Sequence, residues 1–306
     1  MNGSVLFLRS LSCYLVVLVH VIAIGFNKTS GFEWVVINFF DSAARCAVPV
    51  FLMISGFLWG GRKNDLYFIF NRFKKFFIVG LFWVPFYGFF GELTWLDGFS
   101  YHLWYFYFLF VLISCAPLLF FLGESFGFFR SSLFLGAISY ALFFFFPDER
   151  IIFLGVDFYV IPFYFTYFMI GAYFFRSGFG FLSYRMSAFL AIISFLCIFL
   201  LTWFFSWRAG HPVEFFYRYH SPFVFLYSVC LFRCFVELHP LPNGRVTQLV
   251  AECSLGVYLV HYFVLTVIRG FSILPLASIF EFFSTMLMSV VIIWLMRKNY
   301  FLKALT

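Results

Sequence analysis

The sequence predicts an all-α integral membrane protein, a bundle of about ten transmembrane helices with both termini in the cytoplasm. The first observation behind this prediction is composition. Of the 306 residues, 64% are hydrophobic and only 11% are charged, whereas soluble domains are about half apolar and about a quarter charged. The second is the recurrence of apolar runs near the ~20 residues that cross a bilayer. The third is the concentration of Lys and Arg in alternate loops, which sets orientation.

Apolar segments follow one another along the whole chain, and Gly, Pro, Asp and Asn separate them as in loops. The first segment has no basic region before Arg9 and no A-x-A cleavage site after it, so we expect it to remain as a span. The third and fifth are short. No repeat, long linker or soluble domain interrupts the pattern, so we expect one membrane domain over residues 1–306. The predicted spans are 4–26, 35–60, 76–91, 101–122, 131–147, 158–175, 186–207, 219–238, 249–270 and 279–296.

Basic residues are distributed unequally between the two sets of loops. Five follow odd-numbered spans: Lys28, Arg150, Arg208, Arg218 and Arg269. Because Lys and Arg accumulate on the cytoplasmic side, the even-numbered loops are predicted inside, and both termini with them. Thirteen lie in these even-numbered loops and the C-terminal tail: Arg62, Lys63, Arg72, Lys74, Lys75, Arg130, Arg176, Arg185, Arg233, Arg245, Arg297, Lys298 and Lys303.

The net charge of +7 comes from these scattered residues, so we predict no nucleic-acid partner. The cysteines mostly lie within apolar runs and form no CxxC pair. Cys230 and Cys234 are one helical turn apart, but no His or carboxylate gives them the spacing of a metal site. We therefore expect small buried hydrophobic residues and predict no metal site.

Arg9 and His20 are ionisable residues inside the first predicted span. A charged group at bilayer depth costs at least about 2.5–3.5 kcal/mol, so such residues usually face a cavity and serve a function. Eleven residues make about three helical turns, which places both on one face but about 16 Å apart. The alternative is an arginine that reaches the interface and a histidine bonded to a neighbouring helix.

Arg45 is a third ionisable residue within a predicted span. Pro49 frees a backbone carbonyl there, and the small pair Ser55-Gly56 allows another helix to approach closely. Asp41 lies four residues before Arg45, so an internal ion pair is the alternative to a role in chemistry.

Two further groups lie near span ends. Arg72 and Lys75 share a helix face at the cytoplasmic end of the third span, where two cations suit a phosphate-bearing ligand; the alternative is ordinary positive-inside anchoring. His102 and Trp104 open the fourth span on the outer side. The aromatic residues beside them form either an interfacial belt or a surface on which a sugar can stack.

His261 lies in the middle of the ninth span. Tyr258 is one turn before it, so a Tyr–His hydrogen bond is the simple alternative to a functional role. His211, His220 and His239 are predicted to lie in loops as solvated surface residues.

Taken together, these residues resemble the acyltransferase 3 family of membrane acyltransferases. The resemblance runs in order through nearly the whole chain, and Lys75 stands where the family often has Arg, which binds phosphate in a bidentate way. The matching elements are Arg9-x10-His20, the block from Arg45 through Val-Pro-Val-Phe-Leu-Met-Ile-Ser-Gly-Phe-Leu, the pair Arg72 and Lys75, the block His102–Phe106, the block Tyr167–Gly171 and the block Ser254–His261.

The resemblance implies an O-acyltransferase, with acetyl-CoA or another acyl-CoA as a cytoplasmic donor substrate and no permanently bound cofactor. Arg72 and Lys75 are then expected to hold the donor phosphates, and the pantetheine arm to pass Arg9. His20 acts either as general base for an attacking hydroxyl or as a nucleophile that carries the acyl group. Arg45 is expected to stabilise the oxyanion.

On the acceptor side, the resemblance implies substrate contacts by His102 and Trp104 and a supporting role for Tyr258 and His261. The family often carries an added extracytoplasmic domain, and this chain, which ends at Thr306, resembles the short members. These modify O-antigen, enterobacterial common antigen or capsule sugars at the bacterial inner membrane.

Other classes of membrane protein are rivals. A transporter or flippase of a lipid-linked sugar also needs cations and aromatic residues facing a cavity, but more often shows inverted repeats and broken helices. A glycan polymerase tends to carry a large external loop. A structural subunit does not explain the intramembrane Arg and His residues.

Overall fold

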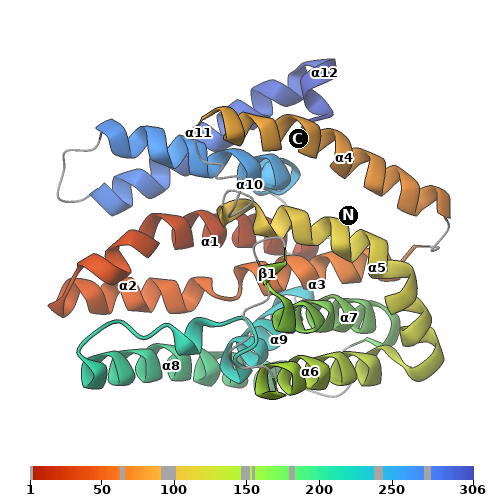
Figure 1. Cartoon of the computed structure of the whole chain (residues 1–306), viewed down its shortest axis with the longest axis horizontal. Helices are drawn as coiled ribbons and strands as arrows, with labels where there is room; N and C mark the ends of the chain where they lie inside the picture. Colours follow the sequence, from red (N-terminus) through yellow and green to blue (C-terminus); the bar gives the residue numbers. More distant parts are fainter. Residues whose placement is uncertain are drawn as a thin grey trace. The chain divides into compact units, whose positions relative to one another are not determined.

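The computed structural model describes residues 3–62, 66–90, 101–145, 152–153, 156–178, 183–237, 244–271 and 277–306. Helices make up nearly all of this part of the chain (Figure 1). A two-residue strand pair, β1 (Ile152–Phe153) with β2 (Val156–Asp157), is antiparallel. The helices are α1 (Gly3–Lys28), α2 (Gly31–Ala44), α3 (Ala47–Gly60), α4 (Leu66–Phe89), α5 (Trp104–Phe126), α6 (Phe128–Phe145), α7 (Ile161–Ser177), α8 (Tyr184–Ala209), α9 (Pro222–Glu237), α10 (Arg245–Phe271), α11 (Ala277–Lys298) and α12 (Tyr300–Lys303).

Within the described residues, nine helical segments are long and apolar enough to cross a membrane. They confirm the prediction of an all-α integral membrane protein. The predicted third span lies in α4, which is not among the nine and whose first half carries Arg72 and Lys75. The predicted span ends at residues 91, 146–147 and 238 lie outside the described residues, as do Lys63, Arg150 and His239.

The chain divides into two compact units built from interleaved segments. The first comprises Met1–Ile54 and Ser177–Leu295, and the second comprises Ser55–Arg176 and Met296–Thr306. The first therefore holds α1, α2, α8, α9, α10 and nearly all of α11, and the second holds α4 to α7 and α12. The single domain over residues 1–306 stays a prediction.

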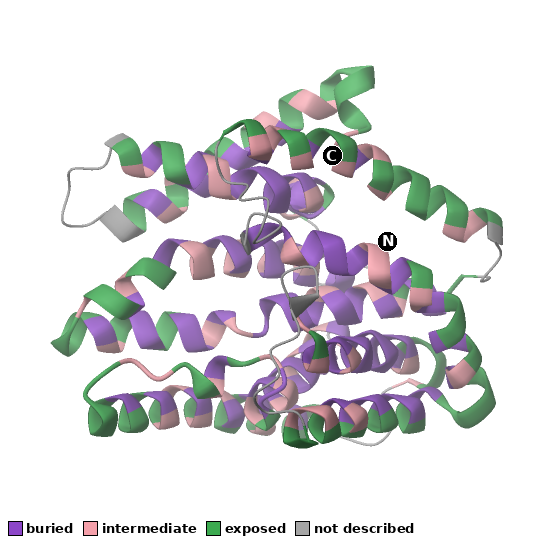
Figure 2. Ribbon diagram, in the orientation of Figure 1, coloured by how far each residue is buried: buried purple, intermediate pink, exposed green. Residues whose placement is uncertain are grey.

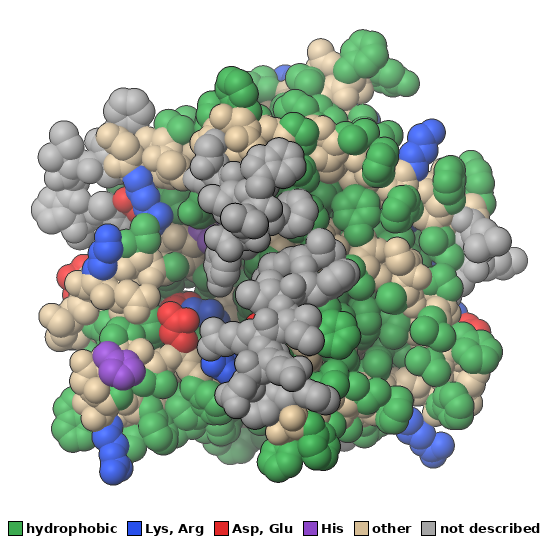
Figure 3. All heavy atoms as spheres, viewed as in Figure 1, with side chains coloured by type: hydrophobic (Ala, Val, Ile, Leu, Met, Phe, Trp, Pro, Cys, Tyr) green, Lys and Arg blue, Asp and Glu red, His purple; other side chains and the backbone are tan. Residues whose placement is uncertain are grey.

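Helix α8 shows why these helices need lipid around them. Figure 2 shows buried and exposed positions alternating along it. Large apolar residues such as Phe189, Ile192 and Trp203 are exposed. In water this arrangement would be inside out, whereas in a bilayer small residues let helices approach closely and large ones meet lipid tails. Hydrophobic side chains also predominate on the face seen in Figure 3. The buried positions of α8 are mostly small: Ser187, Ala191, Ser194, Ile198, Thr202 and Ser206.

The predicted second span is broken into α2 and α3 at Arg45 and Cys46. Pro49 accounts for the position of the break. A proline lacks the N–H that would bond the carbonyl four residues earlier, and its ring clashes with that carbonyl. The residue four before Pro49 is Arg45, which therefore caps the end of α2 instead of lying within a continuous helix.

In the second unit, Gly56 brings α3 against α7. A Cβ atom added at Gly56 would lie 1.8 Å from the carbonyl oxygen of Phe168 and 2.8 Å from its carbonyl carbon. Gly60, one turn later, lies against Phe175 and Ala172 in the same way. The close approach predicted at Ser55-Gly56 is thus confirmed, and the partner is the predicted Tyr167–Gly171 block.

Candidate functional site

Helices α1 and α10 form a polar seam in the first unit, which we call the α1–α10 seam. The Arg9 Nε donates a hydrogen bond to Ser254 Oγ over 2.7 Å, and farther along both helices the rings of His20 and His261 lie 5.0 Å apart. Because the contacts advance in the same direction on both helices, α1 and α10 run parallel. Arg9 and His20 share one uninterrupted helix, as predicted.

Aromatic rings and charged groups surround the imidazole of His20. Its ring meets His261 and, edge to face at 5.9 Å, Tyr262. Arg269 and Arg45 are its cationic neighbours. In the part of the chain that the structure describes, no hydrogen bond to its ring nitrogens is present. The partly buried ring thus keeps nitrogen atoms that can exchange a proton with a ligand.

The tautomer of His261 follows from its neighbours. Its Nδ1 lies 2.7 Å from the carbonyl oxygen of Tyr258 and 3.0 Å from that of Val257. A carbonyl can only accept, so Nδ1 must carry the proton, and in the neutral ring Nε2 carries the lone pair. The predicted Tyr–His contact therefore exists: the backbone carbonyl of Tyr258 accepts the hydrogen bond, and the two rings lie 6.0 Å apart.

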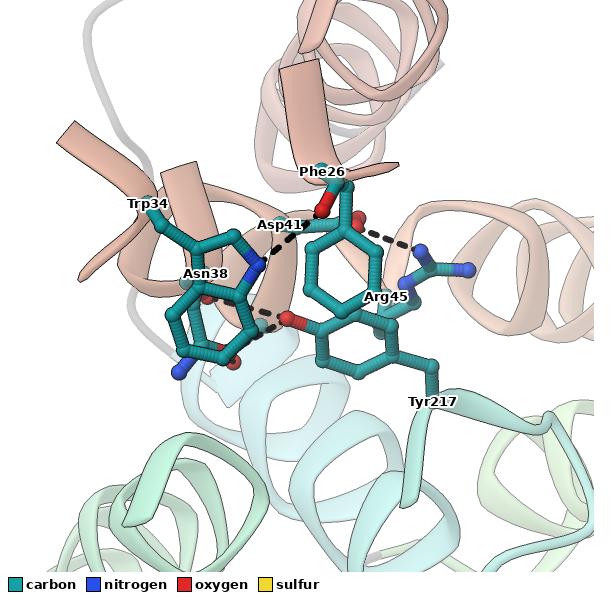
Figure 4. Close-up of polar contacts among 7 residues, drawn as sticks. Phe26, Trp34, Asn38, Asp41, Arg45 and Tyr217 are labelled. Carbon is teal, nitrogen blue, oxygen red and sulfur yellow. Dashed lines mark hydrogen bonds and ion pairs between the residues drawn. The ribbon is translucent and has the colours of Figure 1, made fainter. Parts of the chain in front are cut away.

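Arg45 lies in a buried network at the end of α2 (Figure 4). Its Nη2 is 2.6 Å from Asp41 Oδ2, and its guanidinium carbon lies 4.1 Å from the centre of the Tyr217 ring. The Tyr217 hydroxyl group donates to Asn38 Oδ1. The ion pair considered from the sequence is present. The Arg45 Nε–H nevertheless has no hydrogen-bond partner among the described residues and is buried.

The turn between α1 and α2 supports this network. Trp34 Nε1 donates to the carbonyl oxygen of Phe26 over 3.0 Å, and the Phe26 ring lies 5.2 Å from that of Tyr217 (Figure 4). Tyr217, from the 3-10 turn Phe215–Tyr217, thus contacts both the Arg45 guanidinium and Phe26 at the end of α1.

In the second unit, Arg72 and Lys75 lie exposed on α4. The guanidinium of Arg72 lies 5.2 Å from the Phe68 ring, and that of Arg62 lies 5.4 Å from the same ring. Partial burial and repulsion by Arg62 lower the pKa of Arg72. Neither arginine has an ion pair with a described carboxylate. Arg62 is thus a second guanidinium beside Arg72, which the sequence analysis counted only as a loop residue.

His102 and Trp104 also lie in the second unit, at the start of α5. The His102 side chain is only 1% exposed, and its ring lies 4.5 Å from that of Tyr87. Trp104 is partly exposed and stacks on Tyr164, with ring centres 5.4 Å apart. One face of Trp104 is therefore covered by protein, and His102 is a core residue of this unit.

The structure corrects three sequence-based interpretations. Arg269 and Arg233 are not loop residues: Arg269 lies in the last turn of α10 and Arg233 lies within α9. They pair with Glu281 and Glu237, respectively. His220 is 8% exposed and hence buried, not solvated. The sequence signal for the Arg269 ion pair is Glu281, a carboxylate within the apolar segment 279–296.

The predicted site residues thus fall into two groups. Arg9, His20, Arg45, Tyr258 and His261 belong to the first unit, where they line the α1–α10 seam and the end of α2. The other four, all in the second unit, are Arg72, Lys75, His102 and Trp104.

The cysteines are without disulfides. Five are buried and two are partly buried, as expected of small hydrophobic residues; the partly buried ones are Cys115 and Cys197.

A family model described as an acyltransferase domain matches residues 2–298, nearly the whole chain. Searches of curated proteins and of solved structures found no match. The family match covers every predicted site residue in both units. It agrees with the resemblance carried by Arg9-x10-His20 and the blocks that follow. The chain therefore belongs to the acyltransferase 3 family of multi-pass membrane acyltransferases.

Proposed function

We propose that this protein is an O-acyltransferase of the bacterial inner membrane. It moves an acyl group, in the first instance acetyl, from cytoplasmic acyl-CoA to a hydroxyl group of an extracytoplasmic glycan. O-antigen, enterobacterial common antigen and capsule are the candidate acceptors. One observation carries the proposal: within an acyltransferase family member, His20 presents an imidazole in a membrane span that has no hydrogen bond to a described residue and lies beside His261 and two guanidinium groups.

The donor would be held by cations. Acyl-CoA carries phosphate groups, which guanidinium groups bind through short charge-assisted hydrogen bonds. Arg72, Lys75 and the neighbouring Arg62 supply three positive charges on exposed side chains. Arg9, which is hydrogen-bonded to Ser254, lies on the same face of α1 as His20, about 16 Å away along the helix. That spacing suits a long, extended pantetheine arm whose phosphate end and thioester end need different partners.

The chemical step would use His20 as general base. A ring nitrogen takes the proton from the acceptor hydroxyl group while the hydroxyl oxygen attacks the thioester carbonyl carbon. The tetrahedral oxyanion is stabilised by the Arg45 Nε–H, which is buried without a partner within the described chain. The C–S bond then breaks, and His20 returns the proton to the departing CoA thiolate. The products are the acyl ester and CoA.

The acceptor would meet aromatic side chains. Trp104 is partly exposed and stacks on the buried Tyr164, so its free surface is flat and suits a sugar ring. Because the His102 ring is covered, we propose that it fixes the start of α5 instead of touching the sugar. Tyr258 and His261 would support His20 from the α10 side.

The test uses inner-membrane vesicles, acetyl-CoA radiolabelled in the acetyl group, and the polysaccharide fraction of the host. Wild type is compared with His20→Ala and with His211→Ala, a histidine exposed in a loop. We expect label in the glycan with wild type and His211→Ala. Loss of a general base should reduce labelling by about 10²- to 10⁴-fold in His20→Ala at equal protein abundance.

The other outcomes are also informative. Equal labelling by wild type and His20→Ala would show that His20 is structural. Absence of labelled glycan with wild type would contradict the donor or the acceptor, and a transport assay for lipid-linked sugar in the same vesicles would then be decisive.

A further inference from the structure

Arg269 joins three helices of the first unit at the level of His20. From the last turn of α10, its Nη2 donates to the carbonyl oxygen of Val21 over 2.7 Å and to that of His20 over 3.3 Å. Its Nε lies 3.2 Å from Oε2 of Glu281, near the start of α11. One guanidinium group therefore binds the backbone of α1 and a carboxylate of α11 at the same time.

This arrangement is costly, which argues that it serves a purpose. The side chains of Arg269 and Glu281 are only 24% and 9% exposed, and both lie in helices of membrane-spanning length. An ion pair removed from water seldom adds net stability, and ionisable residues in spans usually serve a function. Carbonyl groups inside a helix already accept a backbone N–H, so α1 does not need Arg269 in order to be helical.

The contact does fix where α1 lies. The two carbonyl groups belong to His20 itself and to the next residue, so the guanidinium sets the height and rotation of α1 at the histidine. Glu281 aims the guanidinium and balances its charge. On the same helix α10, two turns before Arg269, His261 meets the His20 ring. Backbone and ring of His20 are thus both located by α10.

We propose that the Arg269–Glu281 pair is a positioning device for His20. Its role in acyl transfer rests on the function proposed above, whereas its effect on the placement of His20 does not. Lysine cannot replace Arg269, because an ammonium group is a point charge and lacks the planar fork that reaches a carbonyl and a carboxylate together.

The first test reads the placement of His20 without any substrate. Purified protein is treated with diethyl pyrocarbonate, and the rate of modification of His20 is measured by peptide mass spectrometry, with exposed His211 as internal reference. In Arg269→Ala we expect His20 to react about fivefold faster, the order expected when local opening is eased by the loss of hydrogen bonds. Glu281→Gln and Arg269→Lys should show smaller increases in the same direction.

The matched control is Glu237→Gln, which changes a different ion pair of this unit, that with Arg233. It should leave His20 reactivity at the wild-type value. An unchanged or reduced rate at His20 in both Arg269→Lys and Glu281→Gln would overturn the proposal. These two conservative variants keep the test decisive even if Arg269→Ala does not fold.

The second test is kinetic. A displacement of about 1 Å at a catalytic group can cost about 10²-fold in rate, so kcat should fall by about that factor in Arg269→Ala. The KM for acyl-CoA should stay unchanged, because the pair does not bind donor phosphates. A rise in KM at constant kcat would contradict a positioning role. If wild type transfers no acyl group, the proposed function fails, while the reactivity test still decides the placement.

Discussion

The two units of the molecule bury different kinds of side chain. Among the described residues, the buried charged residues Asp41, Arg233 and Glu281 all belong to the first unit. The second unit buries aromatic rings and brings α3 and α7 together through Gly56. Its cations Arg62 and Arg72 remain exposed.

The difference shows two ways to hold helices together where the hydrophobic effect gives no help. Lipid tails are as apolar as leucine, so helices in a bilayer associate through close packing of small residues or through polar contacts. The second unit uses the first way at Gly56. The α1–α10 seam uses polar contacts, and the same polar groups can take part in chemistry.

Substitution at Gly56 should break the second unit and gives the largest effect that we expect. In Gly56→Ala the new methyl group meets a backbone carbonyl at 1.8 Å, and backbone cannot move aside as a side-chain end can. Overpacking of this kind costs about 3 kcal/mol or more. We expect strongly reduced abundance in the membrane and a lower melting temperature in detergent, measured by fluorescence-detected size exclusion after heating.

Gly136→Ala is the control in the same unit. There the added methyl group would lie 3.6 Å from Thr166 Oγ1, an ordinary contact, so abundance should equal that of wild type. Normal abundance of Gly56→Ala would show that α3 and α7 are not in direct backbone contact.

Substitution at His261 should affect chemistry instead of folding, which sharpens the comparison. His261→Ala removes the ring that faces His20 and its Nε2 lone pair. We expect kcat to fall about 10²-fold, the lower range for a group that takes part in proton transfer, at normal abundance.

His261→Asn separates two roles of this residue, because its amide nitrogen can still donate to the Tyr258 carbonyl oxygen. We expect no recovery of activity in His261→Asn, since an amide lacks the basic ring nitrogen of histidine. Recovery would show that His261 only braces α10.

Most of the membrane-spanning segments could be predicted from the sequence, because span length and apolar composition are imposed directly by the bilayer. It also indicated Gly56 as a point of close approach. The break at Arg45 was not predicted, although Pro49 was recognised, because the residue that loses its hydrogen bond lies four positions before the proline. The partner of Gly56 required the fold, since small residues mark a contact without naming what is contacted.

The placement of the candidate site residues was predictable where a local sequence pattern determined it. Arg9 and His20 share a face by helical geometry, and the Asp41–Arg45 pair follows from spacing. The contact of His20 with His261 joins residues far apart in sequence, and Arg269 looked like a loop cation because it stands at a span end. The burial of His102 could not be predicted either, since the sequence of an aromatic-rich helix start is the same at a membrane surface and in a protein core.

Substitution at Arg62 should have the smallest effect and tests whether the exposed cations of the second unit bind the donor. Exposed charges contribute modestly because water and salt screen them, so Arg62→Ala should raise the KM for acetyl-CoA by about threefold to tenfold at unchanged kcat. Acetyl-dephospho-CoA, which lacks the 3′-phosphate, sharpens the measurement. If Arg62 contacts that phosphate, wild type and variant should have equal KM values for this donor.

Arg208→Ala, which changes a cation at the end of α8 in the first unit, is the control and should leave both KM values unchanged. An equal rise in KM for both donors would assign Arg62 to the diphosphate instead, and no rise at all would remove it from the donor site.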